Sequence, residues 1–424
     1  MNLKSKRTLT PKLRFPEFRD KGDWEAQPLD RVSQFVKKKI PLHQLNLDTY
    51  VSTENLSPDY GGIEQASKLP PNGSATEYKP DDILIANIRP YLKKVWRSNR
   101  SGGASNDVIV IRPKTVLRND YLPMVIANDA FINYVMTTVK GVKMPRGDIA
   151  SIKDYIVHYP TLPEQQKIAE CLGSLDGVIA AEGRKLAGLR DHKRGLMQQL
   201  FPGTPTSSSA GGERAGGDAG APSQPRLRFP EFRDKGGWEE KKAGSLFSQR
   251  KEKGQTGLPI YSVTINDGMV LRSTFDRNFY DIEDPAGNKK ARKNDIAYNM
   301  MRMWQGACGV APEDCMVSPA YVVLKPKKGT CPAFFDVLFK RPAILHLLMA
   351  YSRGLTLDRL RLYFDDFTSI PLLVPTEPEQ QRIAECLTAL DALITAQAAK
   401  TDALKQHKRG LMQQLFPAPE EVEA

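Results

Sequence analysis

Two stretches of the chain combine basic, amide and aromatic side chains at spacings that suit nucleic-acid binding. The first is a turn of twelve residues that carries Arg89, Tyr91, Lys93, Lys94, Arg97, Asn99 and Arg100. The second carries Lys289, Lys290, Arg292 and Lys293 and then Asn299, Arg302, Trp304 and Gln305. Cations bind phosphates, while guanidinium, amide and hydroxyl groups read base edges. Because the two sets differ in chemistry, we expect them to contact different sequences.

Further cations follow each of these stretches in a matching late loop. The first loop holds Lys143 and Arg146, and the second holds Arg353 and Arg359. A single surface cation more often serves solubility than binding. Two basic segments at equivalent places in two halves of a chain favour a shared binding surface instead, so we expect these residues to join the same face.

The elements that position these residues belong to a tandem duplication. The motif from Thr161 to Leu172 is repeated from Thr376 to Leu387. The repeat also includes the segment from His192 to Pro202, which matches the segment from His407 to Pro417. An arm from Leu13 to Gly22, followed by Trp24, returns from Leu227 to Gly236, followed by Trp238. Residues 25–160 and 239–374 show no extended match, so two divergent inserts lie on one duplicated frame.

Each repeated motif predicts the start of a long helix. Thr161 with Glu164, and Thr376 with Glu379, have the form of a capping box, with a proline in the first turn. Apolar residues then recur at alternating spacings of four and three, which favours coiled-coil packing. Each helix should end near Phe201-Pro202 or Phe416-Pro417, after about 38 residues and about 57 Å. The predicted seam comprises Ile168, Leu172, Leu175, Ile179, Leu186, Leu189, Leu196, Ile383, Leu387, Leu390, Ile394, Leu404 and Leu411.

Polar residues interrupt both seams. Glu182, Lys193, Gln397, Thr401 and Lys408 occupy positions of the apolar repeat. A polar seam position lowers stability but fixes the register of paired helices. For the two lysines, a long side chain that simply extends into solvent is an equally good interpretation. Two matching seams in one chain predict that the helices pair with each other, antiparallel.

The two inserts share one order of predicted elements and therefore one fold. Short strands are expected at residues 82–88, 108–111, 295–299 and 321–324, because these runs are apolar and are bounded by Gly, Pro, Asn or Asp. Helices are expected at residues 122–139 and 334–351. A Gly/Ser/Ala-rich segment, 203–224, is expected to be a flexible linker between the halves.

Composition narrows the class of protein. A chain of 424 residues is longer than one hydrophobic core usually supports, so more than one domain is expected. Its formal net charge of +12 indicates an anionic partner, with nucleic acid the first candidate. The five cysteines show no metal-ligand or disulfide spacing, and no signal peptide or membrane span is predicted, so we expect a cytoplasmic protein with no membrane partner. Motifs for methyl transfer, nucleotide phosphates or zinc proteolysis are not found, so no catalytic or metal-binding residues are predicted.

The repeated helix motif, the two arms with their tryptophans, and the strand followed by a basic turn together resemble the specificity subunit of type I restriction-modification systems. The resemblance covers nearly the whole chain. It implies an α+β fold with two similar mixed α/β target recognition domains, separated by two long antiparallel coiled-coil helices in a pseudo-twofold tandem duplication. It also implies that each domain reads one half of a split duplex DNA sequence, while the helices set the spacing and dock two methyltransferase subunits.

On this basis the chain divides into seven segments. These are an N-terminal arm (1–24), target recognition domain 1 (25–160), spacer helix 1 (161–202), the linker (203–224), the second arm with target recognition domain 2 (225–375), spacer helix 2 (376–417) and a tail (418–424). The resemblance implies a non-catalytic subunit without its own cofactor. S-adenosylmethionine, ATP and magnesium are expected in its partners, the methyltransferase and restriction/translocase subunits, and base flipping is expected in the methyltransferase.

Two other interpretations stay open from the sequence. The first is the specificity subunit of a related multi-subunit restriction enzyme that cuts beside its site. The second is a structural scaffold whose inserts bind proteins. Sequence-dependent affinity for DNA that falls steeply with salt would exclude the scaffold.

Overall fold

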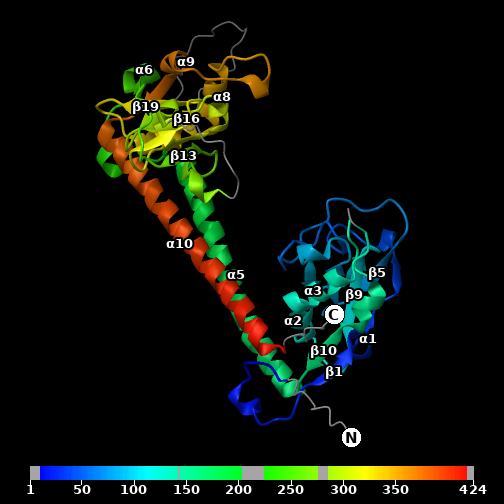
Figure 1. Ribbon diagram of the computed structural model, residues 1–424. Helices are drawn as coiled ribbons and strands as arrows, with labels where there is room; N and C mark the ends of the chain where they lie inside the picture. Colours follow the sequence, from blue (N-terminus) through cyan, green and yellow to red (C-terminus); the bar gives the residue numbers. More distant parts are fainter. Residues whose placement is uncertain (1–9, 142–143, 203–223, 276–284, 418–424) are drawn as a thin grey trace. The chain divides into compact units, whose positions relative to one another are not determined.

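The computed structural model describes residues 10–141, 144–202, 224–275 and 285–417 (Figure 1). The chain forms two compact units. Unit 1 comprises Met1–Arg184 and Ala398–Ala424, and unit 2 comprises Lys185–Gln397. Each unit thus contains one insert and parts of both long helices. The predicted linker at 203–224, except Gln224, and the tail at 418–424 lie outside the described residues.

Unit 1 contains two four-stranded sheets and one strand pair. Its strands are β1 (Glu25–Pro28), β2 (Ser33–Phe35), β3 (Lys39–Pro41), β4 (Tyr50–Val51), β5 (Ser74–Tyr78), β6 (Ile83–Ala86), β7 (Val95–Arg97), β8 (Gly102–Ala104), β9 (Val108–Pro113) and β10 (Ile156–Tyr159). The sheet orders are β2-β9-β6-β7 and β3-β5-β8-β4, and β1 pairs with β10. The short helices are α1 (Leu29–Val32), α2 (Leu122–Ile126), α3 (Asp129–Thr137) and α4 (Ile149–Asp154).

Unit 2 also contains two four-stranded sheets and one strand pair. Its strands are β11 (Glu239–Lys242), β12 (Phe247–Gln249), β13 (Ile260–Val263), β14 (Met269–Leu271), β15 (Lys289–Ala291), β16 (Ile296–Asn299), β17 (Cys308–Val310), β18 (Cys315–Val317), β19 (Tyr321–Pro326) and β20 (Pro371–Val374). The sheet orders are β12-β19-β16-β17 and β14-β13-β18-β15, and β11 pairs with β20. The short helices are α6 (Ala243–Leu246), α7 (Pro332–Phe339), α8 (Pro342–Ala350) and α9 (Phe364–Thr368).

The four predicted strands are confirmed as β6, β9, β16 and β19. Every residue of β6 is buried, which explains its uninterrupted apolar run. The two predicted insert helices are wrong in one respect, because each is broken in two. Asn128 caps α3 by accepting a hydrogen bond from the Ala130 amide, and Pro342 starts α8 after the extended Arg341. Asparagine favours a helix start, and proline disfavours helical backbone in the residue before it.

The long helices are α5 (Leu162–Gln199) and α10 (Glu377–Leu415), which end two residues and one residue before Phe201 and Phe416. They run antiparallel in each unit (Figure 1). In unit 1, Lys408 pairs with Asp176 at 2.5 Å and Lys400 pairs with Glu182. In unit 2, Lys193 pairs with Asp391 at 2.5 Å. The α+β class expected from the sequence is thereby confirmed.

The repeated Glu-Gln of each helix start anchors that helix to its own unit. The Gln165 amide donates to the carbonyls of Val116 and Pro160, and its oxygen accepts from the Arg118 amide. Gln380 makes the equivalent bonds in unit 2. The expected capping role of Glu164 and Glu379 is wrong, because both oxygens of each carboxylate accept hydrogen bonds from an arginine of the arm instead. For a carboxylate, a charged guanidinium is a stronger hydrogen-bond donor than a neutral backbone amide.

The core of each unit includes a helix end. Phe416 packs against Trp24 and Tyr121 in unit 1, with ring centroids 6.4 and 5.7 Å away. Phe201 packs against Trp238 and Phe334 in unit 2, with centroids 5.8 and 5.5 Å away. The arms follow the same pattern, since the Leu13 amide donates to the Gln414 carbonyl and the Leu227 amide donates to the Gln199 carbonyl. Each helix therefore ends by joining the core of a unit.

Candidate nucleic-acid interface

In unit 1 the backbone joins the basic turn to the late loop. The Arg89 amide donates to the Pro145 carbonyl at 2.8 Å, and the Gly147 amide donates to the Asn87 carbonyl at 3.1 Å. Ile88 and Arg146 form an isolated bridge. The two segments that sequence analysis placed on one face thus lie side by side at the end of β6. Lys143 lies outside the described residues.

Several cations of this surface already have partners. Lys93 Nζ lies 2.7 Å from Asp129 Oδ1, and Arg146 Nη2 lies 3.2 Å from Asp107 Oδ1. Lys94 Nζ donates to the Thr53 carbonyl at 2.8 Å. Arg89 has a left-handed backbone, with φ of 52°, and forms no ion pair with any described residue. Together with the exposed Tyr91, it is the side chain of this turn most available to a ligand.

The structure separates Arg97 and Arg100 from this group. Strand β7 pairs Arg97 with Ile83 and Val95 with Ile85, which places Arg97 beside the start of β6 and the basic turn beside its end. Arg97 pairs with Asp81 at 2.6 Å, and the Arg100 guanidinium lies 5.2 Å from the Trp96 ring centroid. The twelve-residue cluster of the sequence is therefore divided between opposite ends of one hairpin.

Unit 2 has the same join between turn and late loop. The Leu362 amide donates to the Met300 carbonyl at 2.9 Å, and Arg353 and Arg361 exchange two backbone hydrogen bonds of 2.9 Å. This brings the segment of Arg302 next to the loop that carries Arg353 and Arg359. The Asn299 side chain caps the turn by accepting from the Met301 amide at 3.0 Å. Arg302 and Gln305 follow on this turn, and Arg302 is exposed.

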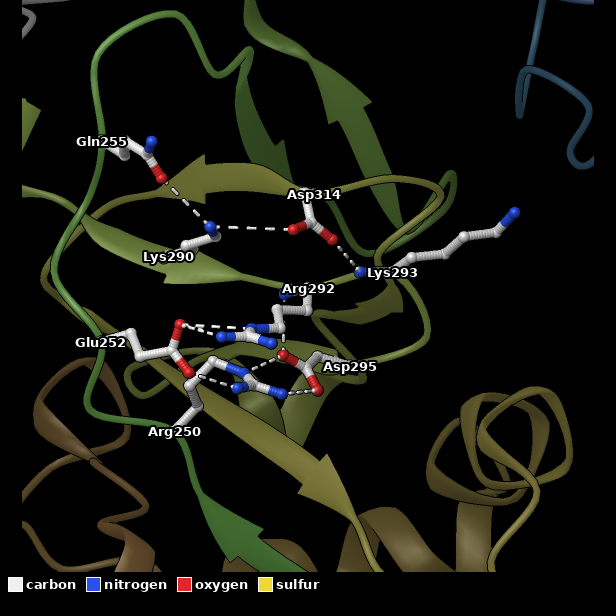
Figure 2. A network of polar contacts seen from close by, with 8 residues as sticks. All are labelled: Arg250, Glu252, Gln255, Lys290, Arg292, Lys293, Asp295 and Asp314. Atoms are coloured by element: carbon white, nitrogen blue, oxygen red, sulfur yellow. Dashed lines mark hydrogen bonds and ion pairs between the residues drawn. The ribbon is translucent and has the colours of Figure 1, made fainter.

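Two other predicted cations of unit 2, Lys290 and Arg292, belong to a polar network at the start of β16 (Figure 2). Arg250 binds both oxygens of Asp295 and also Glu252, which pairs with Arg292 at 3.0 Å. Lys290 lies 3.7 Å from Asp314. Hydrogen bonds from Arg250 and then Arg292 lower the pKa of the Glu252 carboxyl. Lys290 and Arg292 thus already have carboxylate partners.

Lys293 differs from its neighbours in the network. Its backbone amide donates to Asp314 at 3.0 Å, while its side chain extends away from the acids (Figure 2). A hydrogen bond from this amide lowers the pKa of Asp314. Lys293 is therefore an exposed cation that lies at the opposite end of β16 from Asn299.

Sequence reasoning missed two residues of the late loop in unit 2. Arg361 and Tyr363 line an open cleft of about 760 Å³ with Arg353 and Arg359. The alternation of arginine and leucine from Arg359 to Leu362 is the signal for an extended segment with one basic face. This alternation can be recognised in the sequence, but the cleft cannot, because it depends on how the loop folds back.

The predicted seam residues form the less exposed face of the long helices. Ile168 and Leu172 are buried in the core of unit 1, Ile383 and Leu387 are buried in the core of unit 2, and the remaining seam residues are half-buried. Val178 and Leu393, which are repeat equivalents, are instead 44% and 56% exposed. The helices thus present a matching apolar side chain to solvent in each unit.

Among the described residues, no cluster of three or more potential ligands for a metal ion occurs, and no helix combines the length and apolar character needed to cross a membrane.

Two repeated units, each with a joined basic turn and late loop, define a protein built from duplicated domains that present basic segments at equivalent places. The model of the type I restriction modification DNA specificity domain matches residues 21–190 and again 236–406. These matches cover most of the chain, which therefore belongs to this family.

The chain is also similar to individual proteins. It is 24% identical over 195 residues to the type I restriction enzyme MjaVIII specificity subunit of Methanocaldococcus jannaschii. That match spans 45% of this chain and 43% of the relative, so it covers less than half of either protein.

Two solved structures share the fold. The S subunit of a type I restriction-modification system from M. genitalium has a TM-score of 0.57 at 13% identity, over 97% of this chain and all of that one (100%). A chain from a structural study of complex assembly and conformational transition in the type I system has a TM-score of 0.54 at 17% identity, over 93% of this chain and 98% of that one. At these identities the likeness extends to the fold alone.

Proposed function

We propose that this chain is the DNA specificity subunit of a type I restriction-modification complex, and that each unit reads one half of a split duplex sequence. The observation that carries the proposal is that the family model matches each half separately, and that each half joins a basic turn to a late loop. Family membership favours this role over the protein-binding scaffold.

The two half-sites should differ. The surface of unit 1 offers Arg89 and Tyr91, whereas that of unit 2 offers Arg302, Gln305 and Arg359. Arginine prefers the O6 and N7 acceptors of guanine, while glutamine prefers the N6 and N7 groups of adenine. A common fold with different side chains supports the reading of two different short sequences.

We propose further that the chain is non-catalytic and acts with partner subunits in the cytoplasm. Methyl transfer with S-adenosylmethionine, and cleavage or translocation with ATP and magnesium, would belong to two methyltransferase subunits and to restriction subunits. The repeated exposure of Val178 and Leu393 supports one docking position for a methyltransferase in each unit. An apolar side chain that recurs at one position of a helix face is a suitable anchor for a partner helix.

A genome-wide map of methylated adenines, with and without this chain, tests the proposal. Deletion should abolish methylation of one split motif and leave all others, and complementation should restore it. Persistence of every motif in a strain whose methyltransferase is expressed would contradict the proposal. A map from a strain with the intact unit 1 and a foreign unit 2 should keep one half-site and change the other.

A further inference from the structure

The late loop of unit 2, residues 353–363, is a closed hairpin. Its base is held by the reciprocal 2.9 Å hydrogen bonds between the backbones of Arg353 and Arg361. Gly354 has a φ of 157°, and a Cβ atom at this position would lie only 2.6 Å from the Arg359 carbonyl oxygen. A side chain would clash there, so glycine lets the two arms of the loop approach closely. The base of the loop is therefore closed by the backbone itself.

Two leucines at the tip of this hairpin face solvent. Leu355 is 96% exposed and Leu357 is 55% exposed. Exposed apolar side chains are ordinary when they are scattered. Here two of them lie within three residues of one constrained loop, beside arginines, which is an arrangement suited to a ligand with both anionic and apolar groups.

The cleft behind the tip supplies the cations. Arg353, Arg359, Arg361 and Tyr363 line it, together with Asp365 and Asp366. Asp366 is engaged by Arg353. Among the residues that the structure describes, neither Arg359 nor Arg361 forms an ion pair with a carboxylate, so their charge remains available for an anion.

Unit 1 has a related pattern of residues at its late loop, although Arg146 there is paired with Asp107. Gly141 has a φ of 90°, Met144 is 51% exposed, and Arg146 follows two residues later. In unit 2 the residues at the same sequence spacings are Gly354, Leu357 and Arg359. The order of glycine, exposed apolar residue and arginine thus recurs in two inserts whose sequences have otherwise diverged.

We propose that the hairpin 353–363 is a two-part DNA contact, in which Arg359 and Arg361 hold a backbone phosphate while Leu355 and Leu357 contact thymine methyl groups in the adjoining major groove. This inference rests on the proposed function and assigns separate roles within one surface. The thymine methyl is the apolar group that the major groove displays, so it suits the leucines. The backbone phosphates that border the groove are the anions that suit the arginines. The leucines would provide specificity, and the arginines would provide affinity without sequence preference.

The test uses the full-length chain and duplexes that carry the methylation motif, with a scrambled duplex as reference. Leu355→Ala with Leu357→Ala should weaken binding to the motif about tenfold and leave scrambled-duplex binding and the salt slope unchanged, as expected for lost base contacts. Arg359→Ala with Arg361→Ala should weaken binding to both duplexes and reduce the slope of log K against log salt by about 0.9, because one phosphate contact is lost. Lys328→Ala is the matched control, because it follows β19 at the end of the sheet remote from Asn299.

Replacement of thymine by uracil in the half-site of unit 2 removes the methyl groups alone. It should reproduce the tenfold loss in the wild-type protein and cause no further loss in the double leucine variant. Equal binding of thymine and uracil duplexes would overturn the inference, as would leucine variants that bind the motif normally. In either case, preference of the wild-type protein for the motif would still support the proposed function. Leucine variants that keep DNA binding but lose a copurifying methyltransferase would also overturn it. Wild-type protein that does not prefer the motif would instead contradict the proposed function.

Discussion

The guanidinium of Arg14 donates two hydrogen bonds to the carboxylate of Glu164, from Nε to Oε1 and from Nη2 to Oε2, each 2.8 Å long. The side chains are only 9% and 1% exposed. Arg228 and Glu379 repeat the pair in unit 2 with two bonds of 2.7 Å. In each unit this pair joins the arm to the start of a long helix, which explains why the arm and the helix motif are duplicated together.

Removal of one partner should destabilise the unit strongly. We expect Glu164→Ala to lower the free energy of unfolding of unit 1 by about 3 to 5 kcal/mol, because it leaves a buried guanidinium unpaired. Arg14→Met combined with Glu164→Leu should cost less than the single change. Denaturant unfolding of the full chain measures both, with Glu379→Ala as the equivalent change in unit 2. A loss below about 0.5 kcal/mol, typical of surface substitutions, would contradict this role.

The ion pairs between the long helices should contribute little individually but should depend on charge sign. Lys193→Glu places two carboxylates together and should reduce stability by up to about 1 kcal/mol, and the loss should shrink at high salt. The double reversal Lys193→Glu with Asp391→Lys should recover most of it. Thermal unfolding of the single and double variants at two salt concentrations tests this. Additive losses in the double variant would show that the pair is not coupled.

The two ends of β16 should differ in DNA binding. Arg302→Ala removes an exposed cation beside the late loop, and Lys293→Ala removes one from the opposite end of the strand. We expect Arg302→Ala to weaken motif binding about tenfold or more, in line with loss of a base or phosphate contact. Lys293→Ala should change it less than twofold. Fluorescence titration with a labelled duplex provides the comparison, and the reverse order would place the interface at the polar network.

Shortening both long helices should shorten the gap between the half-sites. Deletion of residues 180–183 together with 395–398 removes about 6 Å from each helix, close to two base pairs at about 3.4 Å per pair. The seam stays roughly in phase, because four residues are about one turn. Methylation mapping in a strain that carries this variant gives the new gap directly. Replacement of the same residues by alanine is the control for length, and an unchanged gap in the deletion variant would exclude a spacing role.

Much of the fold could be predicted because its signals are local. The alternation of apolar residues places the long helices correctly to within a few residues at their ends, because helical periodicity depends on side chains only three or four positions apart. The apolar runs that form β6 and β9 likewise predict these strands from local sequence. The helix break at Pro342 was missed, although proline is a local signal, because the apolar run continues through it.

The candidate interface was only partly predictable, because it depends on register and pairing between distant residues. The sequence by itself determined the duplication, the strands and the presence of basic turns. Only the tertiary structure decided that Arg97 and Arg89 lie at opposite ends of a hairpin, and that Arg292 has a carboxylate partner whereas Arg359 has none among the described residues. The physical reason is that a cation's availability depends on which acids the fold brings near it, and those acids are far away in the sequence or on another strand.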